Sequence, residues 1–422
     1  MQASGTRHFV LLFAVILSIV TYIDRVSISF AGPKIREDLG LSQEQLGYVF
    51  GAFAIAYALF EIPGGWMGDK WGPRKVLARI VLWWSFFTAA TGWATSYIYL
   101  LVVRFLFGAG EAGAFPNITK AFSTWFPAHE KSNAQGIVWM SARWGGAFTP
   151  VLMAGLFQII DWRVAFQIFA VLGVIWVAVF YWWYRDNPKD HKSVNAAELE
   201  IIGDSVKMAD DHGSVPWGRF AQSGSVWLLW VQYFMLSYGW YFYITFFPTY
   251  VKDALGFDLK AGGAVLSGLP LFLGGIGCLV SGRLTPWYAR KLGDARKARK
   301  HMAAFGMTMA GILLLVSLNI KDPLIVVFVI GLASFFNDLV MPPAWSTCMD
   351  VGGKFAGTLS GSMNMMGNFA GFAAPVVIGK VLAAMNGDFT LSFYISAAAY
   401  FIGALCWLGI NSTKPLDSLS HD

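Results

Sequence analysis

Apolar stretches of about 17 to 25 residues, the length with which an α-helix crosses a bilayer, recur along this 422-residue chain. Hydrophobic residues make up 56% of the sequence and charged residues only 13%, whereas a soluble domain carries about 25% charged residues. The sequence therefore predicts an all-α integral membrane protein. We expect twelve transmembrane helices, at 9–31, 44–67, 76–94, 97–121, 134–157, 162–184, 225–251, 260–284, 301–319, 323–345, 356–382 and 389–411.

An even number of spans places both termini on the same side of the membrane. Most of the 31 basic residues fall in the loops and tails on that side, and such loops stay in the cytoplasm. We therefore expect a multi-pass protein of the cell inner (plasma) membrane with both termini cytoplasmic. The net charge of +6 follows from this loop bias, so nucleic-acid binding is not indicated. The stretch 9–31 is too long for a signal peptide and is interpreted as a retained helix.

The spans form two groups of six, separated by one long charged segment. The predicted domains are an N-terminal bundle at 1–184, a cytoplasmic linker with a short surface helix at 185–224, and a C-terminal bundle with its tail at 225–422. Segments 136–150 and 361–375 share Gly, Met, Gly and Pro at equal spacing. Such internal repeats are typical of transporters whose site lies between two halves. The pattern predicts two pseudo-symmetric six-helix bundles.

Four charged residues fall inside predicted spans, namely Asp24, Arg25, Arg104 and Glu111. A charge at mid-bilayer costs roughly 2.5–3.5 kcal/mol, so such groups normally face a polar cavity or a partner and mark a transport path. Arg104 and Glu111 are about 20° from eclipsed and roughly 10.5 Å apart along one helix. This spacing lets both serve one cavity without direct neutralisation.

Arginine and carboxylate side chains suit different tasks in such a cavity. A guanidinium holds a carboxylate by two parallel hydrogen bonds and stays charged in a dry site. Tyr22 lies three residues before Arg25, so one helix face offers a hydroxyl and a guanidinium together. The protonation of a buried acid near an arginine depends on whether an anion occupies that arginine. Asp24 and Glu111 are therefore predicted to couple protons to an anion.

The turn between the second and third spans reads GGWMGDKWGPRKVL. Its glycines permit close helix approach, and an acid beside basic residues offers contacts that form in one conformation and break in another. The motif resembles the signature loop of the major facilitator superfamily. The resemblance implies a gate formed by Gly65, Asp69, Gly72 and Arg74. The second half has Pro286 where the acid would fall.

Four separated segments narrow the resemblance: YIDR, RFLFGAGEAGAFP, YFYITFFPTY and AWSTCMDVGGKFAGTLSGSMNMMGNFAG. They are similar to the anion:cation symporter family, which includes galactonate, glucarate and hexuronate permeases, sialin and the vesicular glutamate transporters. The resemblance implies that Asp24 and Glu111 form the protonatable pair. It also implies substrate contacts by six residues, Tyr22, Arg25, Tyr57, Arg104, Gln232 and Asn364.

Structural alternatives stand beside some of these roles. Tyr57 could fill a packing position, and Asn364 with Asn368 could hydrogen-bond neighbouring helices. Asp350 and Lys354 suit a solvated or gate position. The cysteines lack metal-ligand spacing and read as packed thiols: Cys278, Cys348 and Cys406.

Three residues depart from the family pattern. Glu61 stands where a neutral amide is common, Arg143 lies inside the fifth span, and Asp338 lies inside the tenth. Unpaired charges there would be costly. We expect Arg143 and Asp338 to approach each other in at least one state; the alternative is that each is paired within its own half or lines the cavity separately.

The sequence therefore predicts proton-coupled symport of an organic anion, a sugar acid such as a hexuronate, aldonate or aldarate, by alternating access. Its partners are the anion, protons and the lipid bilayer, and we expect a functional monomer without metal or cofactor. No nucleotide loop, metal cluster or activated nucleophile indicates an enzyme. The alternatives are a sodium-coupled carrier, an anion exchanger, and a non-transporting sensor of such a ligand.

Overall fold

The computed structural model describes residues 2–203, 205, 215, 217–257, 262–413, 415 and 416. Within these residues the secondary structure is helical and no strand occurs. Residues 206–214 of the predicted linker lie outside the described part, as does the predicted tail beyond 416. Eight helical stretches of the described part are long and apolar enough to cross a membrane.

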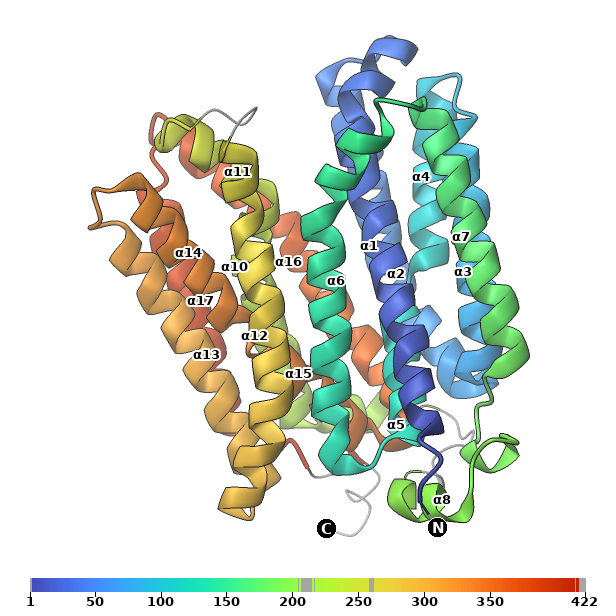
Figure 1. Ribbon diagram of the computed structural model, residues 1–422. Coiled ribbons are helices and arrows are strands. Elements are labelled where there is room, and N and C mark those ends of the chain that lie inside the picture. The colour runs from blue at the N-terminus through green and yellow to red at the C-terminus, as the bar shows by residue number, and fades with distance from the viewer. Residues whose placement is uncertain are drawn as a thin grey trace. The chain divides into compact units, whose positions relative to one another are not determined.

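One compact unit, called unit 1 below, contains Met1–Lys131, Phe148–Val215 and Gly352–Met365. Within it α2 packs along α4, and α3 packs along both α4 and α7 (Figure 1). Its helices are α1 (Thr6–Leu39), α2 (Gln43–Trp71), α3 (Pro73–Gly92), α4 (Tyr97–Glu111), α5 (Ala114–Trp125), α7 (Trp162–Trp183) and α8 (Ala196–Ile202).

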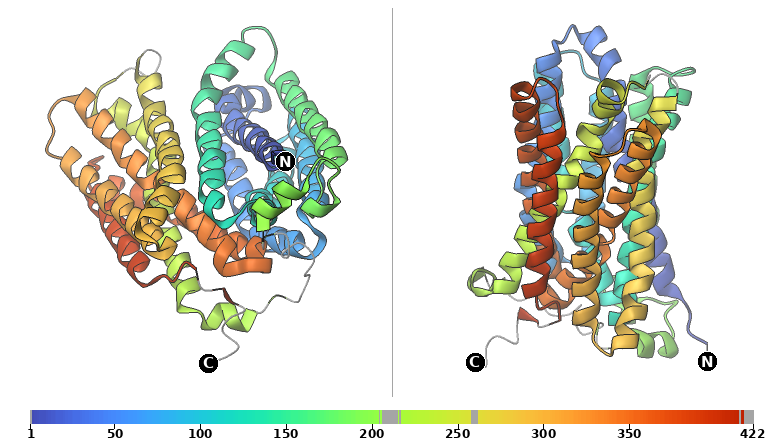
Figure 2. Two further views of the ribbon diagram at one scale, coloured as in Figure 1. Left: turned by 60° about the horizontal axis from the view of Figure 1, so that its bottom comes forward. Right: turned by 90° about the vertical axis from the view of Figure 1, so that its left-hand side faces the viewer.

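The other unit, unit 2, contains Ser132–Ala147, Pro216–Val351 and Met366–Asp422. Here α12 packs along α14, and α13 lies beside α14 and α17 (Figures 1 and 2). Its helices are α9 (Trp217–Gln222), α10 (Gly224–Thr245), α11 (Phe247–Thr249), α12 (Gly262–Leu292), α13 (Ala295–Ser317), α14 (Pro323–Asp338), α15 (Met341–Gly352) and α17 (Thr390–Gly409).

Two long helices belong partly to each unit. The central part of α6 (Ala128–Leu156) packs in unit 2, and the first ten residues of α16 (Ala356–Ala384) pack in unit 1. The predicted division at 185–224 assigned each of these helices wholly to one bundle. The packing units group segments by contact, whereas the predicted domains group the spans that move together. The predicted domain boundaries therefore stay a prediction.

Each predicted span coincides with a helix or a pair of helices in the described residues. Three spans are interrupted where the sequence suggested continuous helices. The fourth breaks at Gly113, which has φ 87°, between α4 and α5. The seventh breaks at Phe246, between α10 and α11. The tenth breaks between α14 and α15. Prolines in the first turn of the following helix favour all three breaks, because proline has no N–H to continue the helix.

These breaks place two acids at helix ends. Glu111 is the last residue of α4, and Asp338 is the last residue of α14. Irregular backbone at membrane depth is tolerated where protein covers it, and both residues are fully buried. Glu111 and Asp338 therefore occupy corresponding places in the two halves of the sequence, because each ends the first helix of an interrupted span.

Polar residues outside the apolar stretches define several helix starts. Ser42 and Gln45 form a capping box at α2, and the Asp322 side chain accepts the Leu324 and Ile325 N–H groups at α14. At α13 the Lys297 N–H donates to the Asp294 carboxylate, and this hydrogen bond lowers the pKa of Asp294. Such caps satisfy N–H groups that lack intrahelical partners.

Candidate functional site

The predicted charges of the first half gather in unit 1. The Arg25 Nε donates to the Glu111 Oε1 at 2.6 Å, joining α1 to the end of α4. The Glu111 side chain is 1% exposed and that of Arg25 is 20% exposed. Glu111 therefore pairs with the arginine on the neighbouring helix and makes no ion pair with Arg104 among the described residues. This agrees with the expectation that Arg104 and Glu111 do not neutralise each other.

Aromatic rings surround the Arg25 guanidinium. Its Cζ lies 4.3 Å from the centroid of the Tyr57 ring, within the range of a cation–π contact. Within the described structure the Arg25 Nη2 has no hydrogen-bond partner. The Arg25 nitrogen that does not bind Glu111 thus lies mostly among apolar ring surfaces. Three further rings lie 5.6–5.9 Å from Cζ: Tyr22, Phe53 and Phe115.

Arg104 is more deeply enclosed, at 2% exposed. Its guanidinium carbon lies 4.1 Å from the Phe107 ring centroid and 5.3 Å from that of Phe53. Its Nε finds no acceptor among the residues that the structure describes. A buried guanidinium with an unsatisfied donor is costly unless a further acceptor is supplied. A bound anion would supply that acceptor.

Asp24 is 2% exposed. Neither of its carboxyl oxygens has a hydrogen-bond partner in the described part of the chain, although Thr88, Arg104 and Glu111 are close enough to interact with it electrostatically. Two unsatisfied oxygens on a buried carboxylate are unfavourable. A proton would remove that charge, which suits the proton-coupling role predicted for Asp24.

Glu61 and Asn364 form a direct contact between α2 and α16. The Asn364 Nδ2 donates to the Glu61 Oε1 at 2.6 Å, while the Glu61 Oε2 has no partner within the described residues. Tyr57 lies one turn earlier on α2, and its hydroxyl is likewise unpartnered among them. Asn364 therefore binds an acid of this chain in this conformation. Its predicted contact with substrate stays a prediction.

The cluster has an unequal charge balance. It contains two arginines, Arg25 and Arg104, and three acids, Asp24, Glu61 and Glu111. Only one ion pair within 4.0 Å joins these five side chains in the described structure. Since unpaired buried charges are expensive, the cluster is suited to take up protons and an anion together.

The signature loop is joined to the start of α16. The Asp69 carboxylate accepts hydrogen bonds from the Gly357 N–H at 3.0 Å and from the Thr358 N–H and hydroxyl, each at 2.6 Å. A carboxylate at a helix N-terminus is stabilised by free N–H groups and by the helix dipole. A Cβ on Gly65 would lie 2.2 Å from the Gly357 oxygen, so glycine is needed for this approach.

The other two residues of the predicted gate, Gly72 and Arg74, shape the turn itself. Gly72 has φ 83° and precedes Pro73, which opens α3. The Arg74 N–H donates to the Asp186 Oδ1 at 2.8 Å, and its guanidinium donates to the Tyr181 carbonyl. The loop is therefore fixed to the end of α7 on one side and to α16 on the other. Its action as a gate stays a prediction.

In unit 2 Arg143 and Asp338 contact each other; an approach across the interface of the two predicted bundles stays a prediction. The Arg143 Nε lies 2.7 Å from the Asp338 Oδ2, and its Nη2 lies 3.0 Å from the Oδ1. Gln232 is fully buried and accepts a hydrogen bond from the Trp407 indole at 3.0 Å. This contact is a packing interaction in unit 2, and the substrate contact predicted for Gln232 is not tested by it.

Other polar residues also contact protein groups. The Tyr241 hydroxyl donates to the Asn368 Oδ1 at 3.3 Å, which fits the helix-to-helix alternative for Asn368. Asp350 accepts from the Arg299 Nη2 at 2.5 Å, and the Lys354 carbonyl accepts from the Lys120 Nζ at 2.6 Å. The three cysteines are buried free thiols, as predicted.

The linker carries contacts that the sequence interpretation missed. Glu198 in α8 accepts the N–H groups of Thr6 and Arg7 at 2.9 and 3.0 Å, as well as the Arg7 Nη1 at 3.2 Å. The Ser4 hydroxyl also donates to it. Burial acts to raise the pKa of Glu198, but these hydrogen bonds together lower it. The available signal was the Ala-Ala-Glu-Leu-Glu segment after Asn195, a pattern typical of a capped short helix.

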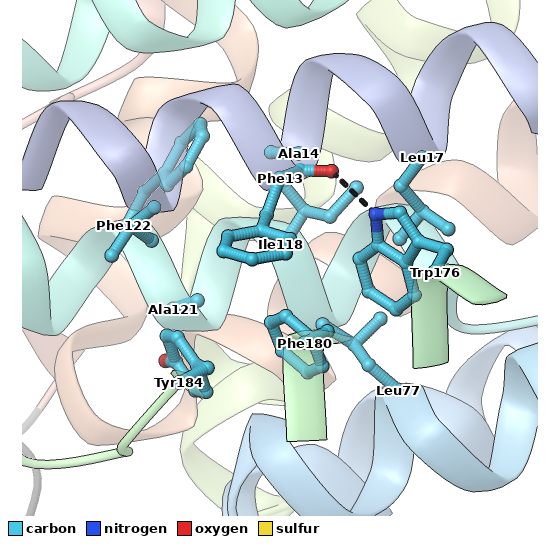
Figure 3. A pocket seen from close by; sticks show the side chains of 11 residues that line it. Phe13, Ala14, Leu17, Leu77, Ile118, Ala121, Phe122, Trp176, Phe180 and Tyr184 are labelled. Carbon is cyan, nitrogen blue, oxygen red and sulfur yellow. Dashed lines mark hydrogen bonds between the residues drawn. The ribbon is translucent and has the colours of Figure 1, made fainter. Parts of the chain in front are cut away.

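A small hollow in unit 1 is unrelated to the charges. It has a volume of about 10 Å³ and lies among apolar side chains of α1, α5 and α7, including Phe13, Ile118 and Phe180 (Figure 3). The Trp176 indole closes one side by donating to the Phe13 carbonyl at 3.1 Å. A space of this size holds at most about one water, so it is no substrate site.

Charged residues enclosed within membrane helices, two of them at breaks in those helices, are typical of membrane transporters. Residues 14–375 match the family model of the Major Facilitator Superfamily, and the chain belongs to this family. It is thus a multi-pass membrane protein and a transporter, not an enzyme, as predicted.

Two relatives match nearly the whole length of this chain. A probable sulfoacetate transporter of Cupriavidus necator is 39% identical, covering 99% of this chain and 96% of that protein. A probable galactarate/D-glucarate transporter of Escherichia coli is 28% identical, covering 97% and 92%. The solved structure of the proton:xylose symporter XylE shares the fold, with a TM-score of 0.77 at 15% identity, covering 99% of this chain and all of that one.

Proposed function

We propose that this protein imports a small organic anion together with one or more protons, by alternating access in the cell inner membrane. The observation that carries the proposal is a pair of arginines with buried, unused donor atoms, Arg25 Nη2 and Arg104 Nε, beside three acids with unpaired oxygens. Guanidinium groups bind carboxylates and sulfonates, and protonation of the acids offsets the charge that the anion brings. The basic residues in the loops support the proposal that both termini are cytoplasmic.

The surroundings of Arg25 favour a compact anion. Its neighbours are mainly aromatic rings, whereas the hydroxyls of a sugar acid each need a polar partner when buried. The relative that is 39% identical is named as a sulfoacetate transporter. We therefore propose a short carboxylate or sulfonate anion, with sulfoacetate as the first candidate. Sugar acids are the second, since the relative at 28% identity is named for galactarate and D-glucarate.

Thermal unfolding of the purified protein tests anion binding. Sulfoacetate, D-galactonate, D-glucarate and neutral D-xylose are titrated separately at fixed ionic strength. We expect sulfoacetate to raise the melting temperature, and Arg104→Lys to remove the shift because a point charge cannot replace the guanidinium fork. Glu37→Gln, at an exposed acid near the end of α1, is the control and should retain it. A shift with D-xylose alone would contradict the proposal.

A further inference from the structure

The Arg143–Asp338 pair has the geometry with which an arginine binds a carboxylate ligand. Two parallel hydrogen bonds of 2.7 and 3.0 Å join the guanidinium to the carboxylate, and the side chains are 3% and 0% exposed. The Asn337 Nδ2 adds a third donor to the Asp338 Oδ1 at 2.9 Å. Asp338 thus receives every hydrogen bond that a bound carboxylate would need.

The surroundings hold these donors in place. The Asn337 side-chain oxygen accepts from the Tyr400 hydroxyl at 2.9 Å, which fixes the orientation of the amide. The Arg143 Cζ lies 4.3 Å from the Trp240 ring centroid. The Trp240 indole N–H has no partner among the described residues, so the site includes an additional buried donor. This donor set fits an anion with two or three acceptor oxygens.

A purely structural ion pair gives little reason for this arrangement. Taking two charges out of water costs about as much as their attraction returns, and well-packed apolar residues are often as stable. Gly274 also makes room for the acid, because a Cβ there would lie 2.3 Å from the Asp338 Oδ2. The position on α12 thus accommodates the carboxylate at the arginine.

We propose that Arg143 is a further anion-binding residue of the transporter and that Asp338 occupies its site while no anion is bound. This inference rests on the proposed function. When the transported carboxylate or sulfonate binds Arg143, Asp338 is displaced and takes up a proton. One anion and one proton enter together, so the charge of the site is unchanged. Asp338 is therefore an internal competitor of the substrate.

Isothermal titration of the purified full-length protein with sulfoacetate and D-galactonate tests the competition. If Asp338 occupies Arg143 about nine-tenths of the time, Asp338→Asn should bind the preferred anion about tenfold tighter than the wild type. Arg143→Gln should weaken binding, and the double variant should behave like Arg143→Gln. Asp350→Asn, which breaks the Arg299–Asp350 pair of unit 2, is the matched control and should leave affinity unchanged.

A second variant covers a failure of Asp338→Asn to fold. Gly274→Ala keeps both charges but forces the carboxylate away from its position, so anion binding should again tighten. Gly268→Ala on the same helix meets nothing within 4 Å and is its control. Unchanged anion affinity in folded Asp338→Asn or Gly274→Ala protein would overturn the inference, while loss of binding in Arg104→Lys would still support the proposed function. If the wild type binds no anion, both are overturned.

Discussion

The Arg25 guanidinium and the Glu111 carboxylate are joined by a 2.6 Å hydrogen bond at the end of α4. The ion pair thus uses the Nε of Arg25 and the Oε1 of Glu111, and it leaves the Arg25 Nη2 and the Glu111 Oε2 without partners among the described residues. An anion that binds Arg25 competes with Glu111, and a proton on Glu111 removes the competitor.

Glu111→Gln separates binding from coupling. Glutamine resembles the protonated acid, so exchange of labelled anion between two equilibrated pools should continue while uptake driven by a proton gradient is lost. Both rates are measured in proteoliposomes, with Glu37→Gln as control. Normal gradient-driven accumulation by Glu111→Gln would make this acid structural and move the coupling role to Asp24.

Glu61→Gln tests the additional acid of the cluster. Glutamine keeps an oxygen that accepts from Asn364, whose donor now lies 2.6 Å from Glu61, but it carries no charge. Removing one negative charge near Arg25 should tighten anion binding at neutral pH by about tenfold, or ~1.4 kcal/mol. The affinity is measured by titration calorimetry. An affinity equal to that of the wild type would mean that Glu61 is already protonated or electrostatically isolated from the anion.

Asp69→Asn should loosen the start of α16. The carboxylate accepts two backbone N–H groups and one hydroxyl there, and loss of a helix cap costs about 1–2 kcal/mol. We expect a lower melting temperature and altered exchange rates in proteoliposomes. Gly65→Ala should act in the same direction, since its Cβ would meet the Gly357 carbonyl, while Gly51→Ala faces open space and is the control. If both variants were as stable as the wild type, the contact between Asp69 and the start of α16 would not contribute to stability, contrary to this prediction.

Glu198→Gln gives a prediction about pH. Hydrogen bonds lower the pKa of Glu198 in the folded protein, so its carboxylate stabilises the fold at pH above the ordinary glutamate value of about 4.3. That stabilisation is lost as pH falls through the lowered folded pKa. At pH 7 the variant should melt about 2–4 °C below the wild type, and the difference should shrink in acid. Glu200→Gln, an exposed neighbour, is the control; a pH-independent difference would contradict this account.

The sequence predicted the helical fold, the family and the charged positions, because apolar length and buried charge are local properties of a chain. It could not assign the partner of Glu111. Helical spacing relates Arg104 to Glu111 on one helix, but the rotation of α1 that brings Arg25 to 2.6 Å depends on tertiary packing. The breaks after Glu111 and Asp338 were likewise missed, because proline inside an apolar run is compatible with a continuous membrane helix.

The linker shows the same limit at the protein surface. Charge and polarity predicted a solvated segment at 185–224, and a short helix is present at Ala196–Ile202. The burial of Glu198 depends on the free N–H groups at the start of α1, nearly two hundred residues earlier in the chain. No local pattern contains that relationship. The cost of leaving Arg143 and Asp338 unpaired indicated that each needs a partner, but it left open whether they contact each other, as they do within unit 2.

Uptake of radiolabelled sulfoacetate into proteoliposomes under imposed gradients tests the central claim of proton-coupled anion import. With an acidic exterior and no sodium, the account predicts accumulation above the external concentration, and collapse of that accumulation when ionophores remove the pH gradient and membrane potential. D-Galactonate and D-glucarate are measured in parallel as second candidates. Accumulation that requires sodium, uptake only in exchange for internal anion, or binding without any transport would contradict the account.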